Sequence, residues 1–351
     1  MKHYIAICNT PYQLMIAVKL KNSIYASDNI TLLLSDHMRN HTILAENTKK
    51  ANIFFDVFPI TTKKLLHTGK KQKWSLVLSK KNCAYYFQQF FPTDKNYDGL
   101  LFANTDYVNT LIYQSLTNKS KDFSISMFED GLSTYSNQYP MRFKEYENFD
   151  FLRKKSVYIY KLIKRIYVLN PDMMEWRPSF PVSTIDTLNT NDIDCLNKCF
   201  CVDVDKIQKQ YNRQVIFFEE SYFAENIPVD DAKIVQHISN MVGKENILVK
   251  MHPRSPRNRF EPLGYETNNS IEIPWEIIAL NIDISSKILV TIGSAAALVS
   301  LTSLYPKKTI MLFTCKEFKN NTILPYESLE HFCKYSKTPI TTFHSIDEIT
   351  L

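Results

Sequence analysis

Four short segments place side chains of this sequence where a proton could be transferred or an anion held. The first is Glu129-Asp130-Gly131, which directly follows an apolar run and so puts two carboxyl groups at the end of an expected buried strand. Like charges side by side raise the pKa of one of them, which suits a general base. The glycine allows a tight backbone turn. The segment therefore predicts a base, with capping of the next helix as the structural alternative.

The second segment is Lys250-Met251-His252-Pro253-Arg254. It places one histidine at an expected strand end, beside a proline that restrains the turn and an arginine. Such a cluster can bind a phosphate group and exchange a proton with it. We therefore expect Lys250, His252 and Pro253 to take part in binding a phosphorylated substrate, the alternative being a histidine that only caps a loop.

The third and fourth segments lie at expected helix starts. In Gly293-Ser294-Ala295 a strand gives way to a helix, where free backbone N–H groups and a hydroxyl attract anions. In Pro274-Trp275-Glu276 a carboxylate falls in the first helical turn, where it could accept hydrogen bonds from ribose hydroxyls. The structural alternatives are an ordinary serine cap and a glutamate favoured by the helix dipole.

Three further segments are candidates for the same site. Glu219-Glu220 closes another expected strand, and Asn9-Thr10-Pro11-Tyr12-Gln13 follows the first strand and begins a helix. Asp203-Val204-Asp205 matches the DxD pattern of metal-binding nucleotide-sugar enzymes, but it lies in a polar helical stretch and not at a strand end. We therefore expect no metal and no other cofactor. Carboxylates, a His-Pro pair and a serine together favour transfer of a group from an activated phosphate ester to a hydroxyl.

Strands and helices must alternate to bring these segments together. Apolar runs and helical periodicity predict strands at 4–7, 30–34, 53–57, 97–103 (with an Asp-Gly turn) and 123–128, helices from 11 and at 107–116, and a basic helix at 153–166. The pattern restarts with strands at 214–218, 246–251, 271–273, 287–292 and 309–313, and helices at 230–241, 275–281 and 295–304. This alternation predicts an α/β protein of two doubly wound Rossmann-like domains facing a central cleft, as in GT-B-type glycosyltransferases.

Length and composition agree with that organisation. The 351 residues are enough for two domains, here assigned to 1–170 and 213–351 with a linker and helices at 171–212. The 6 glycines form no GxGxxG and no P-loop motif, and the 7 cysteines form no CxxC pair and are expected to be reduced thiols. Lys and Arg number 42 against 36 Asp and Glu, and the resulting +6 is weak for a nucleic-acid-binding protein. No apolar stretch approaches the roughly 20 residues of a transmembrane helix.

The ordered set Glu129-Asp130-Gly131, His252-Pro253 and Gly293-Ser294 resembles the bacterial sialyltransferases, most of all glycosyltransferase family 52, the lipooligosaccharide sialyltransferases. The resemblance implies a CMP-sialic acid donor, whose phosphate His252 and Ser294 would bind and whose ribose Glu276 would bind. It leaves the general base open between Asp130 and Glu220.

We therefore expect an inverting, metal-independent sialyltransferase that moves sialic acid to a galactose hydroxyl of a lipooligosaccharide or another surface glycan. The alternative is another nucleotide-sugar transferase of this fold, a glucosyltransferase or a polysialyltransferase; a non-enzymatic carbohydrate- or nucleic-acid-binding module is a further rival. The acceptor is expected to be lipid-linked, and the protein cytoplasmic and peripheral on the inner membrane. The sequence is compatible with a homodimer and does not specify the linkage formed.

Overall fold

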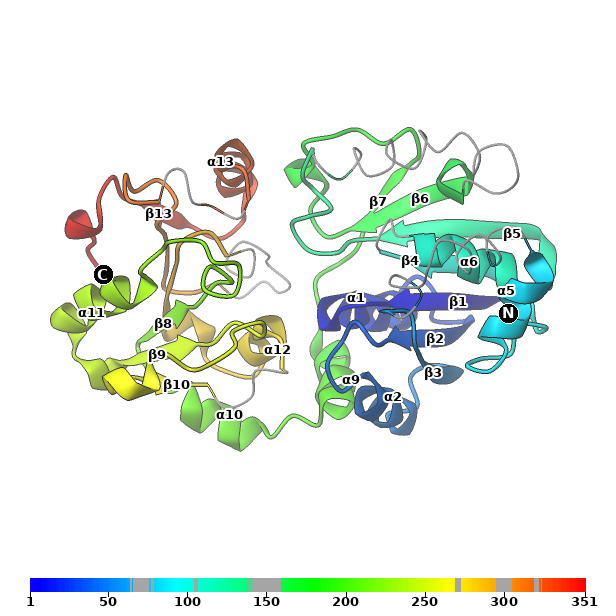
Figure 1. Ribbon diagram of the computed structural model, residues 1–351, viewed down its shortest axis with the longest axis horizontal. Coiled ribbons are helices and arrows are strands. Elements are labelled where there is room, and N and C mark those ends of the chain that lie inside the picture. Colours follow the sequence, from blue (N-terminus) through cyan, green and yellow to red (C-terminus); the bar gives the residue numbers. More distant parts are fainter. Residues whose placement is uncertain are drawn as a thin grey trace. The chain divides into compact units, whose positions relative to one another are not determined.

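Two parallel β-sheets organise the chain, one in each of two units (Figure 1). The computed structural model describes residues 1–63, 65, 76, 79–103, 107–137, 139, 159–268, 273–294, 305–318, 322 and 324–351. The chain divides into Met1–Cys201 and Val202–Leu351. This boundary lies within residues 171–212, which the sequence assigned to a linker.

The sheet of the first unit has seven strands in the order β3-β2-β1-β4-β5-β6-β7, all parallel to their neighbours. The direction in which strands are added reverses between β1 and β4, which makes that point the place where ligands bind in such sheets. The strands are β1 (His3–Cys8), β2 (Asn29–Ser35), β3 (Asp56–Ile60), β4 (Asn96–Phe102), β5 (Asn118–Phe128), β6 (Ile163–Val168) and β7 (Val182–Thr184).

Helix α1 of the first unit begins at Pro11, the residue at which the sequence predicts a helix start. Thr10 accepts a hydrogen bond from the Gln13 N–H and Pro11 occupies the first turn, as in a standard N-cap. A buried ion pair between Lys19 and Asp192 joins α1 to α9. The described helices of this unit are α1 (Pro11–Asn22), α2 (His41–Lys50), α5 (Lys80–Phe87), α6 (Tyr107–Ser115) and α9 (Thr190–Phe200).

The sheet of the second unit repeats the same topology, with the order β10-β9-β8-β11-β12-β13 and its reversal between β8 and β11. Its strands are β8 (Val215–Phe218), β9 (Ile247–Lys250), β10 (Glu266–Thr267), β11 (Ile288–Thr291), β12 (Lys308–Met311) and β13 (Ile340–Thr342). Its described helices are α10 (Val204–Gln210), α11 (Asp231–Val242), α12 (Trp275–Leu280) and α13 (Tyr326–Tyr335).

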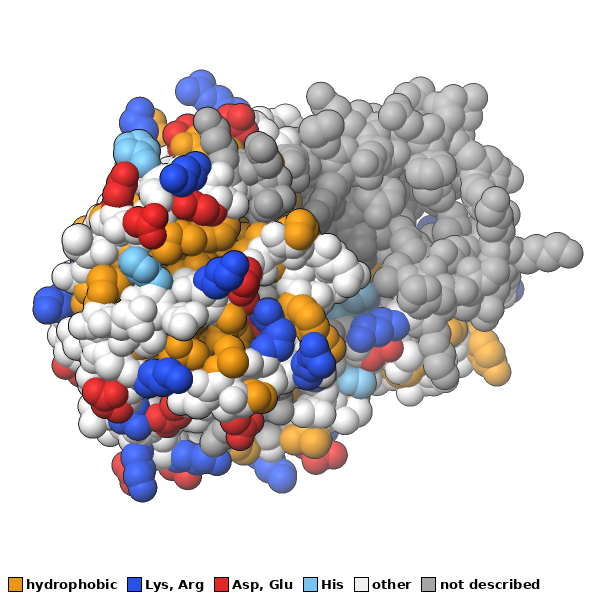
Figure 2. Space-filling view, turned by 60° about the vertical axis from the view of Figure 1, so that its left-hand side comes forward, with side chains coloured by type: hydrophobic (Ala, Val, Ile, Leu, Met, Phe, Trp, Pro, Cys, Tyr) orange, Lys and Arg blue, Asp and Glu red, His pale blue; other side chains and the backbone are white. Residues whose placement is uncertain are grey.

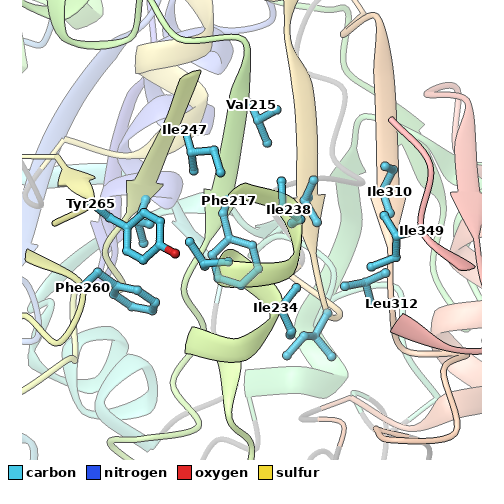
Figure 3. Packing of buried hydrophobic residues seen from close by; sticks show 14 of the residues in the cluster. Val215, Phe217, Ile234, Ile238, Ile247, Phe260, Tyr265, Ile310, Leu312 and Ile349 are labelled. Carbon is cyan, nitrogen blue, oxygen red and sulfur yellow. The ribbon is translucent and has the colours of Figure 1, made fainter. Parts of the chain in front are cut away.

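Strand β8 shows how this second sheet is buried on both faces. Val215 and Phe217 pack into a cluster with Ile234 and Ile238 of α11 (Figure 3). Ile216 and Phe218 alternate with them and pack on the other side, against Trp275 of α12 and Tyr211 after α10. Residues after β8 therefore emerge from a rigid, doubly covered strand, which gives them a well-defined position.

Several sequence predictions are corrected here. The predicted helix at 153–166 is wrong from residue 159 onward: Ile159–Leu162 is a short 3-10 helix and Ile163–Val168 is β6, which pairs with β5 and buries Ile163, Ile166, Tyr167 and Val168. Gly99 lies within β4 and not in a turn; its missing side chain lets Ser124 O and the Tyr4 ring approach to 2.6 and 2.8 Å of the position of a Cβ. The third strand starts three residues later than expected. Sequence patterns did not predict α2, α5, β7, β10, α13 or β13.

The other predicted strands and helices are confirmed to within about five residues wherever the structure describes them, except that Ile273, the one described residue of the predicted strand at 271–273, is not in a strand. All or part of three predictions falls outside the described residues: the helix at 295–304, which includes Ala295, residues 153–158 of the predicted basic helix, and residues 271 and 272 of the short strand at 271–273.

Candidate active site

Glu129 follows β5 and is completely buried. Its Oε1 accepts a hydrogen bond from the Tyr12 hydroxyl, and its Oε2 accepts from the Tyr135 hydroxyl and, at 2.6 Å, from the Leu169 N–H. Burial raises the pKa of this carboxyl group, and the hydrogen bonds oppose the increase. Glu129 thus connects α1, β5 and the segment after β6, and its side chain is occupied by the protein itself.

Asp130, the next residue, is only half-buried. Its Oδ1 accepts from Gln13 Nε2 at 2.8 Å and from the Thr10 hydroxyl at 3.4 Å, both at the start of α1. Gly131 then adopts a positive φ of 64°, and no atom of the other described residues, its two chain neighbours aside, lies within 4 Å of the position that a Cβ would take. The glycine therefore turns the chain away at a conformation that other residues adopt at a cost. This geometry places the Asp130 carboxylate at the carboxyl end of the sheet, beside the start of α1.

The start of α1 supports Asp130 through a buried glutamine. Gln13 Oε1 accepts from the Asn9 N–H at 2.6 Å, which fixes the amide so that its Nε2 donates to Asp130. Asn9 is buried as well, directly after β1. The sequence pointed to this segment as a contacting loop; that it orients the Asp130 carboxylate is visible only in the structure.

In the second unit, Glu220 is buried after β8 and bonded to the end of β11. Its Oε1 accepts from the Thr291 hydroxyl and from the Gly293 N–H, both at 2.7 Å. The Thr291 oxygen in turn accepts from the Ser294 N–H at 2.8 Å. Burial raises the pKa of the Glu220 carboxyl group. Glu220 thus fastens the Gly293-Ser294 turn across the point where the strand order reverses.

Glu219 is also buried, and it contacts the histidine segment. Its Oε2 accepts from the His252 N–H at 3.0 Å and from the Ser255 hydroxyl at 2.6 Å, and its Oε1 accepts from Arg259 Nη2 at 2.8 Å. The two neighbouring glutamates after β8 therefore organise two different loops, Glu220 the turn after β11 and Glu219 the loop after β9.

The imidazole of His252 is held as a neutral ring. Its Nδ1 accepts a hydrogen bond from the Arg254 N–H at 3.1 Å. Burial, with the charges of Arg254 and Lys250, lowers the pKa of His252 to about 4. A neutral imidazole that accepts at Nδ1 carries its proton on Nε2. At neutral pH the ring can therefore donate a hydrogen bond through Nε2, and an anion bound there would favour its protonated form.

Lys250 and Glu276 form a second pair of charges beside this loop. Lys250 is buried at the end of β9, and within the described part of the chain its Nζ makes no hydrogen bond and no ion pair. Burial lowers the pKa of Lys250 to about 8, while the charge of Glu276 in the first turn of α12 acts in the opposite direction. Burial also raises the pKa of Glu276. An anion or a hydroxyl group bound here would give the Lys250 Nζ a hydrogen-bond partner.

The structure thus divides the sequence-predicted residues between the carboxyl ends of two sheets. Asn9, Glu129, Asp130 and Gly131 lie together in the first unit. The second unit contains Glu220, Lys250, His252, Pro253, Glu276, Gly293 and Ser294. Ala295 lies outside the described residues.

Local sequence reasoning missed Gln13 as the partner of Asp130, and Glu219 and Arg259 as partners of the histidine loop. Glu219 adjoins a predicted residue, but Arg259 carries no local signal. Asp203 caps α10 by accepting from the Lys206 N–H at 3.0 Å. Among the described residues, no three His, Cys, Asp or Glu side chains are grouped as metal ligands. All seven cysteines are free thiols.

Comparison with known families identifies the chain. A family model described as "Alpha-2,8-polysialyltransferase (POLYST)" matches residues 4–314. The chain belongs to the alpha-2,8-polysialyltransferase family. The match spans Asn9, Asp130, Glu220, His252 and Ser294, so both strand-end clusters lie within the family region. The predicted relation to sialyltransferases is therefore supported, whereas membership of glycosyltransferase family 52 stays a prediction.

The fold has solved counterparts. The alpha/beta-galactoside alpha-2,3-sialyltransferase of the luminous marine bacterium Photobacterium phosphoreum has a TM-score of 0.52 and 12% identity, over 99% of this chain and 98% of that one. Spinosyn forosaminyltransferase SpnP has a TM-score of 0.49 and 8% identity, over 100% and 87%. The two Rossmann-like units are those of a GT-B-type glycosyltransferase fold. A search of curated proteins gave no significant match.

The described surface and helices have the following charge and hydropathy. Basic and acidic side chains are interspersed over the described surface visible in Figure 2. Every helix in the described ranges is too short or too polar to cross a lipid bilayer.

Proposed function

We propose that this protein is an inverting sialyltransferase that uses CMP-N-acetylneuraminate as donor and a glycan hydroxyl as acceptor. The observation that carries the proposal is the family match over residues 4–314, which includes every candidate residue from Asn9 to Ala295. The half-buried Asp130 and the neutral His252 supply the acid–base groups that such a reaction needs.

On the donor side, the phosphate of CMP would bind at the ends of β9 and β11. His252 Nε2–H, the Lys250 ammonium and the Ser294 hydroxyl would offset the charge that develops on the phosphate as it leaves. Glu276 would accept hydrogen bonds from the ribose. The C2–O bond to the phosphate breaks, its electron pair stays on the phosphate oxygen, and CMP departs without need of a metal ion.

On the acceptor side, Asp130 would take the proton of the attacking hydroxyl. The acceptor oxygen then bonds to C2 of the sialic acid from the face opposite the leaving phosphate, which inverts that centre. Glu220 is the alternative base, but both partners of its Oε1 are donors of the Gly293 turn. Asp130 has the greater exposure and is our choice.

Two acceptor classes follow from different observations. The motif resemblance favours a terminal galactose, as in a lipooligosaccharide. The family description favours a terminal sialic acid joined through an α2,8 linkage. In either case we propose a lipid-linked surface glycan reached at the inner membrane, with CMP-sialic acid as the common donor.

A donor panel with purified protein tests the proposal. CMP-sialic acid, UDP-glucose and UDP-N-acetylglucosamine are each offered with galactose-terminated and sialic-acid-terminated oligosaccharides, with EDTA present. With the wild type we expect release of CMP and a product that is heavier by one sialic acid. With His252→Ala we expect neither. Turnover with a UDP-sugar but not with CMP-sialic acid would overturn the donor assignment, and a requirement for added metal would overturn the metal-independent mechanism.

A further inference from the structure

The loop that carries His252 is fastened by one buried carboxylate. We use "His252 loop" for residues 252–259. Glu219 accepts from the main chain at the first residue of the loop, from Ser255 in its middle and from Arg259 at its last residue. A single side chain therefore fixes three points along eight residues.

Arg259 extends this connection to helix α11. Its Nη2 donates to Glu219 Oε1 and to Asp231 Oδ2, each at 2.8 Å, and Asp231 is buried in the first turn of the helix. The guanidinium carbon also lies 4.5 Å from the centroid of the Phe223 ring. The His252 loop is thus anchored both to the strand end and to the helix that covers the sheet.

The chemistry of this cluster explains why a carboxylate stands at position 219. The three groups that bond to the Glu219 carboxylate are all hydrogen-bond donors. Without such donors, burying the carboxylate would destabilise the fold by several kcal/mol. An amide in the same place would direct its NH2 group at a donor, so Gln cannot replace all three hydrogen bonds. The hydrogen bonds of the His252 loop therefore require a carboxylate at position 219.

We propose that Glu219, acting with Arg259, is a positioning residue that holds the His252 ring with Nδ1 toward the Arg254 N–H and Nε2–H toward the donor phosphate. The second half of this statement rests on the proposed function. The first half concerns the protein without substrate and can be tested independently.

The charges around His252 allow a test whose sign is informative. The basic groups are Lys250 at the end of β9 and Arg254, Arg257 and Arg259 in the loop. The acidic groups are Glu219, Glu220 and Glu225 after β8, Asp231 of α11 and Glu276 of α12. Glu225 raises the pKa of His252 through its charge. Removing a nearby negative charge alone would therefore lower this pKa. Releasing the loop into water would instead raise it toward 6.5, the ordinary value.

The experiment compares Glu219→Gln with Glu225→Gln and with Glu266→Gln, whose ion pair with Arg213 lies elsewhere in the unit. Nitrogen-15 NMR of the histidine rings, with His252 assigned by its loss in His252→Gln, reports the tautomer and the protonation over a pH range that extends below the wild-type pKa of about 4. We expect Glu219→Gln to raise the pKa of His252 by about one unit or more and to mix the tautomers. Glu225→Gln should lower it and Glu266→Gln should leave it unchanged.

Kinetics with CMP-sialic acid supply the second readout. Misplacing the ring should lower kcat by about 10²-fold in Glu219→Gln, with a smaller change in KM for the donor. If that variant does not fold, Ser255→Ala removes one of the three hydrogen bonds and should show the same directions with smaller size. A folded Glu219→Gln protein with an unchanged tautomer and an unchanged or lowered pKa of His252 would overturn the proposal. Absence of activity in the wild type would refute the proposed function while leaving the NMR test intact.

Discussion

Two pairs of neighbouring carboxyl groups, each directly after a buried strand, have different surroundings in the two units. After β8, Glu219 and Glu220 are both buried and each carries hydrogen bonds that fasten a loop. After β5, Glu129 is buried and bonded in the same way, but Asp130 is half-buried. Gly131 then turns the chain away at a positive φ.

This difference suggests that the four carboxylates have different roles, which their residue types do not reveal. Three of the four carboxylates hold the protein together at the ends of strands, where buried charges need several donors. Asp130 has the exposure that a base requires to reach a substrate. The predictions below test that division, starting with the largest expected effect.

Asp130→Asn is expected to lower kcat by roughly 10²–10⁴-fold, because the amide cannot accept the proton of the acceptor hydroxyl. The thermal unfolding temperature should change little, since Gln13 and Thr10 can still donate to the amide oxygen. Steady-state kinetics and thermal unfolding check both statements. Asp122→Asn, at an exposed position in β5, the strand that precedes Asp130, is the matched control and should retain full activity. Wild-type activity in folded Asp130→Asn would rule out this residue as base.

Glu220→Ala is expected to destabilise the protein by about 1–3 kcal/mol for each of the two buried donors that lose their acceptor. Glu220→Gln keeps an acceptor oxygen for Thr291 and Gly293, so it should unfold at nearly the wild-type urea concentration and keep kcat within about tenfold. Urea unfolding and kinetics measure these effects. If instead folded Glu220→Gln loses as much kcat as Asp130→Asn, the roles of the two acidic pairs are reversed.

The low pKa of His252 predicts a loss of stability in acid. The unfolded chain takes up a proton near pH 6.5 and the folded protein only near pH 4, so protonation favours unfolding between these values. This contribution is present in full above pH 6.5 and falls by up to about 3 kcal/mol as the pH decreases toward 4.

The measurement is the free energy of unfolding against pH for the wild type and His252→Asn. The difference between the two proteins should shrink on acidification, while contributions of other groups cancel. The same substitution at His237 on α11 measures the general effect of replacing a histidine. A difference that is independent of pH would show that the ring is not held neutral.

Tyr12→Phe should give the smallest effect, a loss of about 1–3 kcal/mol of stability, because buried Glu129 keeps its bonds to Tyr135 and Leu169. Differential scanning calorimetry gives the loss. Tyr85→Phe, at a hydroxyl-bearing side chain that is 76% exposed on α5, should be neutral. A drop in kcat comparable with that of Asp130→Asn would show that Glu129, and not its neighbour, is coupled to the reaction.

Much of the fold was predictable, since apolar runs and caps are local signals. Thr10-Pro11 marked the start of α1, and the apolar strands before Glu129, Glu219, His252 and Gly293 marked where polar residues must leave the sheet. The prediction of a helix over residues 163–166 was wrong because a short apolar pattern with basic residues between fits either a helix or a strand. Pairing with β5 makes this segment a strand.

The sequence by itself determined the alternation of strands and helices and the polar residues that end the strands, because hydrophobic periodicity and capping act over a few residues. Only the tertiary structure decided what each carboxylate does. Glu129 is hydrogen-bonded to Tyr12, 117 residues away in the sequence, and Glu220 to Gly293, 73 residues away. No local sequence pattern specifies such partners. Since exposure and hydrogen bonding control the pKa and reach of an acid, its chemical role is set by these distant contacts.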